Sequence, residues 1–144
     1  MKTGLWINIQ IILKSVSKRF ESSLFDIQNL VQADLFDSEL DAAKELLKNK
    51  FTRAAGAICG VILEKHLKLV CESHEVKIGR KKATIGNFND VLKDSQIIEM
   101  SQWRFIQHLA DIRNICGHDD EVEPTQDQVS DLIQGVSKIT KTLY

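Results

Sequence analysis

The segment from Arg113 to His118, with the sequence RNICGH, combines the side chains of this chain that are best suited to chemistry. It places an arginine near the end of an apolar helical run, Asn114 beside it, and a histidine directly after Gly117, which can end the helix. A guanidinium binds phosphate oxygens in a fork, and an imidazole exchanges protons near neutral pH. Arg113, Asn114 and His118 are therefore candidates for binding and cleaving a phosphodiester. The alternative is that Arg113 caps the carbonyl groups of its own helix and that His118 is an ordinary loop residue.

Several other charged residues are candidates for supporting roles. Glu64, on a predicted central helix, either pairs with Arg113 and fixes its rotamer or is a surface carboxylate with Lys68 as its i+4 partner. Arg104 lies off the apolar stripe of its helix and could contact phosphate. The basic run 77–82 is either a solvated loop or a phosphate-contacting arm. The cations considered for that arm are Arg80, Lys81 and Lys82.

The remaining titratable residues are weaker candidates. The acidic run 119–123, directly after His118, would repel RNA or bind a basic inhibitor. We expect His66 and His74 at the surface or at a helix cap, and His108 partly buried or at an interface. The cysteine and histidine of the motif have no further ligands at a suitable spacing, so the sequence predicts neither a metal nor a cofactor.

The elements that must position these residues are predicted to be helices. The first 35 residues form one long amphipathic helix, with a break near residues 22–23, and its apolar face is a candidate dimer surface. Its apolar positions are Leu5, Ile9, Ile12, Val16, Phe20, Leu24, Ile27 and Val31. Ser38 is predicted to cap the next helix, which ends in a tight turn near residues 48–50.

A second helix, from about Thr52 to Ser73, is predicted to be the central one, because small residues such as Gly56 and Gly60 let another helix approach closely. Residues 74–83 are predicted to form a loop. Further helices are expected after Thr84, from Met100 to Gly117, and after a capping box of Thr125 and Gln128. The prediction is an all-α, up-and-down antiparallel bundle of about five to six helices. It is one domain over residues 1–144, with the N-terminal helix at 1–35 and the core bundle at 38–144.

Composition sets further limits. The chain has 144 residues, a single proline and a net charge of -1, so it carries no general positive field for nucleic acid. The three cysteines form no metal-binding or disulfide pattern, which favours a reducing cytoplasm. The apolar N-terminal stretch is interrupted by polar residues and predicts an amphipathic helix and neither an export signal nor a membrane span.

The segment RNICGH also resembles the signature of the HEPN superfamily, in which an arginine is followed by four to six residues and then a histidine. Arg113, Asn114 and His118 match it. Residues 53–69 (RAAGAICGVILEKHLKL) resemble the second core helix of the family, with an inward glutamate at Glu64. Residues 101–114 (SQWRFIQHLADIRN) resemble bacterial members as well. The similarity extends from about Ser38 to the end of the chain.

The resemblance implies a helical bundle that forms a two-fold homodimer, with the two arginine–histidine motifs facing each other across a cleft. It implies a metal-independent endoribonuclease of a toxin–antitoxin, phage-defence or RNA-processing system, with an antitoxin or defence protein as partner. The alternative is a non-catalytic module for nucleotide or RNA binding or for dimerisation, or the C-terminal part of a larger defence protein. The toxin subgroup paired with nucleotidyltransferases often has tyrosine two residues after the histidine, where this chain has Asp120, so that partner is not expected.

The chemistry of RNA cleavage can be assigned to these residues without a metal, because RNA carries its own nucleophile in the ribose 2′-hydroxyl. His118 would take the proton of that hydroxyl or protonate the leaving 5′-oxygen. Arg113 would hold the non-bridging oxygens and stabilise the transition-state charge, and Asn114 would orient the phosphate or the histidine. The products would be a 2′,3′-cyclic phosphate and a 5′-hydroxyl.

Overall fold

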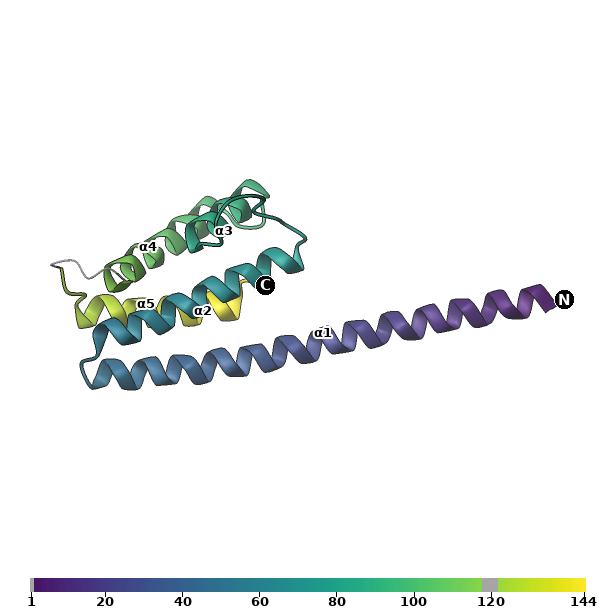
Figure 1. Ribbon diagram of the computed structural model, residues 1–144, viewed down its shortest axis with the longest axis horizontal. Coiled ribbons are helices and arrows are strands. Elements are labelled where there is room, and N and C mark those ends of the chain that lie inside the picture. Colours follow the sequence, from purple (N-terminus) through teal and green to yellow (C-terminus); the bar gives the residue numbers. More distant parts are fainter. Residues whose placement is uncertain (1, 118–121) are drawn as a thin grey trace. The chain divides into compact units, whose positions relative to one another are not determined.

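The computed structural model describes residues 2–117 and 122–144 of the chain. Within these residues every regular element is a helix: α1 (Lys2–Lys48), α2 (Thr52–Ser73), α3 (Ile85–Asp94), α4 (Met100–Gly117) and α5 (Gln126–Thr142) (Figure 1). The prediction of an all-α bundle is confirmed, and the five described helices agree with the expected five to six.

The chain divides into two units, which we call the N-terminal segment (Met1–Leu35) and the core unit (Phe36–Tyr144). The division lies beside the sequence-based boundary between residues 1–35 and 38–144. The predicted break near residues 22–23 and the predicted helix start at Ser38 are wrong, because α1 is continuous from Lys2 to Lys48. Neither glycine nor proline occurs between residues 5 and 48, and serine in a helix interior costs only a few tenths of a kcal/mol, roughly, relative to the better helix formers. The buried residues Phe36 and Leu40 also lie on either side of Ser38 and hold this turn in the helix.

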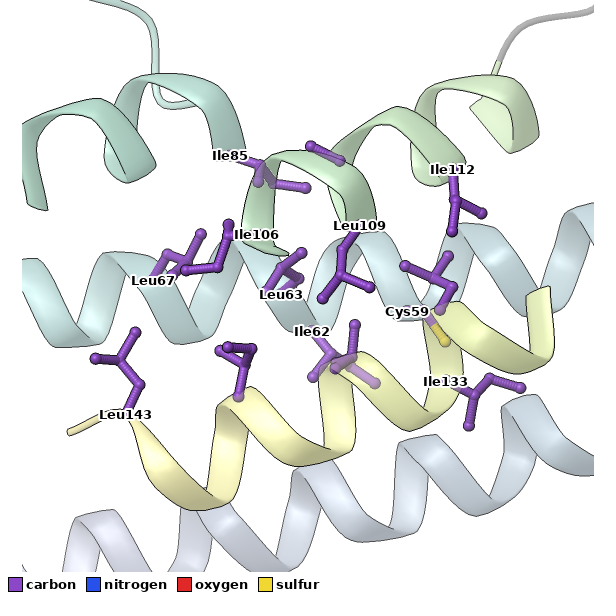
Figure 2. Close-up of a cluster of buried hydrophobic side chains, with 14 of the residues drawn as sticks. Cys59, Ile62, Leu63, Leu67, Ile85, Ile106, Leu109, Ile112, Ile133 and Leu143 are labelled. Carbon is purple, nitrogen blue, oxygen red and sulfur yellow. The ribbon is translucent and has the colours of Figure 1, made fainter. Parts of the chain in front are cut away.

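The core unit is built around α2, which packs against α3, α4 and α5. The chain reverses direction between α2 and α4 and again between α4 and α5, so α5 runs parallel to α2 (Figure 1). Figure 2 shows Ile106, Leu109 and Ile112 of α4 directed at the apolar face of α2, where Leu63 and Leu67 are fully buried. This packing fixes the face of α4 that bears the arginine of the motif.

Two glycines of α2 allow α4 to approach closely, as the small residues predicted. A Cβ atom built on Gly60 would lie 2.5 Å from Cγ and 2.9 Å from Nε of Arg113. A Cβ atom built on Gly56 would overlap the Sγ atom of Cys116. The missing side chains therefore make room for two consecutive turns of α4 near its C-terminal end.

The predicted helix ends are mostly confirmed. The hydroxyl of Thr84 accepts a hydrogen bond from the backbone N–H of Asn87 (3.2 Å) at the start of α3. Thr125 and Gln128 form the expected capping box of α5, with hydrogen bonds of 3.0 and 3.1 Å. The tight turn after α1 is also present, with Lys50 in the left-handed region at φ 66°. These local signals position α3 and α5 around the central helix.

Candidate functional site

Arg113 lies in the last turns of α4, and its side chain crosses α2 at Gly60. The side chain is half-buried, and Nη1 donates a hydrogen bond of 3.4 Å to Oδ1 of Asn114. The same Nη1 is 3.8 Å from a Cβ atom built on Gly117. The guanidinium therefore reaches the residue that directly precedes His118 in the chain.

The charge of Arg113 has no carboxylate partner within ion-pair distance among residues 3–117 and 122–144. The exposed Asn114 offers it a neutral amide oxygen instead. Because a guanidinium has five donors, one hydrogen bond to an amide leaves capacity for an anion. This arrangement is suited to holding two phosphate oxygens.

His118, the second half of the predicted catalytic pair, lies outside the described residues, as do residues 119–121 of the acidic run. Its orientation relative to Arg113 stays a prediction. The structure does describe the residues on both sides of this segment, and they are held by a residue to which the sequence had not assigned a role.

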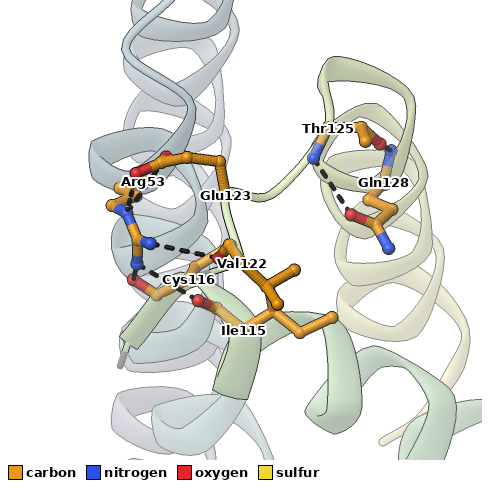
Figure 3. Close-up of polar contacts among 7 residues, drawn as sticks. All are labelled: Arg53, Ile115, Cys116, Val122, Glu123, Thr125 and Gln128. Atoms are coloured by element: carbon orange, nitrogen blue, oxygen red, sulfur yellow. Dashed lines mark hydrogen bonds and ion pairs between the residues drawn. The ribbon is translucent and has the colours of Figure 1, made fainter. Parts of the chain in front are cut away.

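That residue is Arg53, in the first turn of α2 (Figure 3). Its Nη1 donates to the carbonyl oxygens of Ile115 (3.3 Å) and Cys116 (3.4 Å), which are unsatisfied at the end of α4. Its Nη2 donates to the carbonyl oxygen of Val122 (3.2 Å), and its Nε lies 3.2 Å from both carboxylate oxygens of Glu123. One guanidinium thus binds the chain immediately before and immediately after residues 118–121.

The capping of α4 that was considered for Arg113 is therefore performed in part by Arg53. A sequence signal for this existed, because a cation in the first turn of a helix is unfavourable toward the helix dipole and needs acceptors elsewhere. The sequence did not indicate where those acceptors lie, since they are 62–70 positions away along the chain.

Both arginines act electrostatically on the buried thiol of Cys116. Burial raises the pKa of Cys116, and the positive charges of Arg53 and Arg113 oppose that rise. Burial, and to a smaller extent Cys116, raises the pKa of Cys59 to about 12. Both thiols are therefore uncharged near neutral pH and are not suited to act as nucleophiles.

The structure does not bring the supporting residues to Arg113. Glu64 is half-buried, but within the described part of the chain no ion pair joins it to Arg113 or to Lys68, which instead lies 3.8 Å from Glu72. Arg104 is exposed and precedes Arg113 by nine residues, which places the two on opposite sides of α4.

The basic loop is also distant from Arg113. Arg80, Lys81 and Lys82 are exposed and follow the C-terminal end of α2, whereas Arg53 and Gly60 belong to its first half. Gly60 and the end of α2 are separated by roughly 20 Å at 1.5 Å per residue. A contact between RNA and this loop would need a strand that extends along the bundle.

The prediction for His66 is wrong. His66 is buried, with 7% of its surface exposed, and its Nε2 donates a hydrogen bond to the carbonyl oxygen of Leu143 (2.8 Å). Burial lowers the pKa of His66, and the backbone carbonyls of Leu143 and Ile139 partly oppose this. His108 is exposed and not partly buried, and it lines a groove of about 450 Å³ between α4 and α5. The alternative for His108, a place at an interface, stays a prediction. Of the histidines that the structure describes, none lies in the turn of α4 that bears Arg113.

Comparisons with other proteins give no further assignment. No family model, no curated protein and no solved structure matches the chain. Among the described residues, no group of three or more histidine, cysteine, aspartate or glutamate side chains could hold a metal ion. In the same residues, no helix combines the length and the apolar character needed to cross a membrane.

Proposed function

We propose that this chain is a dimeric, metal-independent endoribonuclease of the HEPN type, with Arg113 and His118 as its catalytic pair. The observation that supports this best is the position of the Arg113 guanidinium. It is held against Gly60, it has a neutral hydrogen-bond partner in Asn114, and it reaches Gly117, the residue before His118. An arginine and a histidine that are this close along the backbone suit one phosphodiester.

The proposed reaction is an in-line transfer within the RNA. The ribose 2′-oxygen attacks the adjacent phosphorus atom, the bond from phosphorus to the 5′-oxygen breaks, and a 2′,3′-cyclic phosphate forms. His118 takes the proton of the 2′-hydroxyl or supplies a proton to the leaving 5′-oxygen. In a two-fold dimer with facing motifs, the two copies of His118 would perform one proton transfer each.

Arg113 would stabilise the charge on the non-bridging oxygens of the transition state, and Asn114 would orient the phosphate. Arg53 is a positioning residue in this scheme. It binds the carbonyl oxygens of Cys116 and Val122 on either side of the segment that carries His118, and it thereby restricts where that segment can lie. A fixed backbone on both sides reduces the entropy lost when the histidine meets its substrate.

The test is cleavage of single-stranded RNA in excess EDTA. The wild-type chain is expected to cut, and Arg113→Ala and His118→Ala are expected to reduce the rate by about a hundredfold or more. Lys141→Ala, which changes an exposed cation on α5, is the matched control. Products should carry 2′,3′-cyclic phosphate ends, and a substrate with a 2′-deoxyribose at the cut position should remain intact. Cleavage that needs a divalent metal, or that survives both motif substitutions, would contradict the proposal.

The second candidate is a non-catalytic HEPN module that binds nucleotides or RNA, or that serves in dimerisation. It is favoured by the way the stem of Arg113 fills the space above Gly60, which is a packing role. In this case the wild-type chain would bind RNA without cutting it. Arg113→Ala would then mainly lower the free energy of unfolding. The cleavage assay and a denaturation curve on the same variants separate the two candidates.

A further inference from the structure

The N-terminal segment, which is the purple to blue part of α1 in Figure 1, carries a stripe of large exposed apolar side chains. We call these residues the N-terminal stripe: Leu5, Ile9, Ile12, Val16, Phe20, Leu24, Ile27 and Val31. Each exposes between 40% and 65% of its surface. At 1.5 Å per residue the stripe is roughly 40 Å long. Apolar surfaces of this extent usually mark an interaction site.

The stripe lies on one face of α1. Its members recur at steps of three and four residues, whereas Lys14, Lys18 and Glu21 project from other faces of the helix. The side opposite the stripe mixes these charges with the exposed apolar residues Ile7, Ile11 and Phe25. A helix with this much exposed apolar surface is more stable packed against another helix than alone in water. The spacing of the stripe and the charges of the N-terminal segment indicate which helix this partner is.

The spacing between stripe residues is the same when it is followed from Leu5 to Val31 or from Val31 to Leu5. The steps from Leu5 to Val31 are four, three, four, four, four, three and four residues. A second copy that runs antiparallel can therefore align every stripe residue with a stripe residue, in the register where the two residue numbers add up to 36. The resulting layers are Leu5 with Val31, Ile9 with Ile27, Ile12 with Leu24, and Val16 with Phe20. An arbitrary spacing would match itself only in a parallel pair.

Charge distinguishes the two orientations. The first 20 residues contain lysine and arginine, including Lys14 and Arg19, but neither aspartate nor glutamate. Residues 20–37 contain aspartate and glutamate, including Glu21 and Asp26, but neither lysine nor arginine. A parallel pair places like charges beside each other along its whole length, and an antiparallel pair places the basic half of one helix beside the acidic half of the other.

We propose that the N-terminal stripe binds a second copy of this chain as an antiparallel pair of helices centred on residue 18. Burial of the stripe drives association, and attraction between the basic half of one helix and the acidic half of the other selects the antiparallel orientation. The proposal does not depend on the endoribonuclease function, and it concerns residues 5–31 alone.

The orientation can be measured by nitroxide labels at two exposed positions of the same flank, in Ser17→Cys and Gln28→Cys of the full chain. In the antiparallel register the two labels are separated along the helix axis by about 3 Å for position 17 and about 30 Å for position 28. A parallel pair gives the same short distance at both positions. The native cysteines are buried, and the unsubstituted chain treated with the same label provides the background. Equal distances at the two positions would refute the antiparallel register.

The stripe itself is tested by a pair of matched substitutions. Phe20→Asp places a carboxylate in the centre of the proposed interface and is expected to weaken dimerisation by a hundredfold or more in analytical ultracentrifugation. Phe25→Asp changes another exposed phenylalanine, which lies off the stripe, and is expected to change it by less than threefold. Equal effects of the two substitutions would count against the stripe as the interface.

The charge pairing is tested by a swap. Replacing Lys14, Lys18 and Arg19 together by glutamate should weaken dimerisation by about tenfold or more, since an acidic half of each helix then lies beside an acidic half of the other. Adding Glu21→Lys and Asp26→Lys to this variant should restore dimerisation, which neither a parallel pair nor an unrelated partner would produce. A wild-type chain that sediments as a monomer at about 100 µM would overturn the proposal. Binding of that monomer to anionic lipid vesicles would instead indicate that the stripe binds a membrane surface.

Discussion

Arg53 and Glu123 form an ion pair, with Nε of the arginine 3.2 Å from both carboxylate oxygens, between the start of α2 and the chain leading into α5. The same arginine binds the last carbonyl groups of α4. The carboxylate is 74% exposed, whereas the arginine side chain is only 27% exposed. The arginine is therefore expected to matter more for stability than its acidic partner.

This difference gives the first prediction. Glu123→Gln should lower the free energy of unfolding by less than about 1 kcal/mol, because an exposed ion pair contributes little. Arg53→Met should lower it by about 1–3 kcal/mol, because the carbonyl groups of Ile115 and Cys116 lose a donor. Urea denaturation of the two variants provides the comparison. Equal losses would show that the ion pair, and not the capping of α4, carries the contribution of Arg53.

The contact between Gly60 and Arg113 gives the second prediction. Gly60→Ala should be destabilising by about 1–3 kcal/mol, since the new Cβ would lie 2.5 Å from Cγ of Arg113 and overpack the interface between α2 and α4. The control is Gly86→Ala in α3, where a Cβ meets nothing within 4 Å. It should be stabilising by up to about 1 kcal/mol through helix propensity.

A double variant checks the origin of the Gly60 effect. Combined with Arg113→Ala, the cost of Gly60→Ala should largely disappear, because the stem that it overlaps is gone. If thermal unfolding shows that the stability losses of the two single variants simply add up in the double variant, then Gly60 is constrained by something other than Arg113.

His66 gives a pH dependence of stability. Burial lowers its pKa in the folded chain, so below about pH 6.5 the unfolded chain binds a proton that the folded chain does not. The free energy of unfolding should therefore be constant for this group above that pH and should fall as the pH drops through about 6.5 toward the lowered pKa. His66→Gln should be less stable at pH 8, because the bond to Leu143 changes, and should show a smaller decrease between pH 7 and pH 5. An unchanged decrease in the variant would exclude His66 as its source.

The proposed role of the Arg113 fork leads to a prediction about activity. Arg113→Lys keeps the positive charge but loses the planar pair of donors, and RNA cleavage should fall by about a hundredfold. Substrate affinity should change much less than the rate of cleavage under single-turnover conditions, because the fork is proposed to act on the transition state. A loss confined to affinity would instead assign Arg113 to ground-state binding.

Local signals in the sequence predicted much of the core unit. The caps at Thr84 and Thr125, the turn near residue 50 and the small residues at Gly56 and Gly60 each act on neighbouring residues or on one helix face, so their effect can be derived from the chain alone. The serine at position 38 shows the limit of such signals. It has the side chain of a helix cap, but Phe36 and Leu40 are buried on either side of it, and their packing keeps α1 continuous.

The sequence by itself determined the all-helical character of this protein, the positions of most helix ends, and the adjacency of Arg113, Asn114 and Gly117 on one helix end. Only the tertiary structure decided that Arg53 closes the end of α4 and that His66 is buried against the end of the chain. The physical reason is the distance along the chain over which the two kinds of interaction act. Helix formation depends on side chains within about four positions of each other, whereas a hydrogen bond between residues more than sixty positions apart depends on how every intervening helix packs.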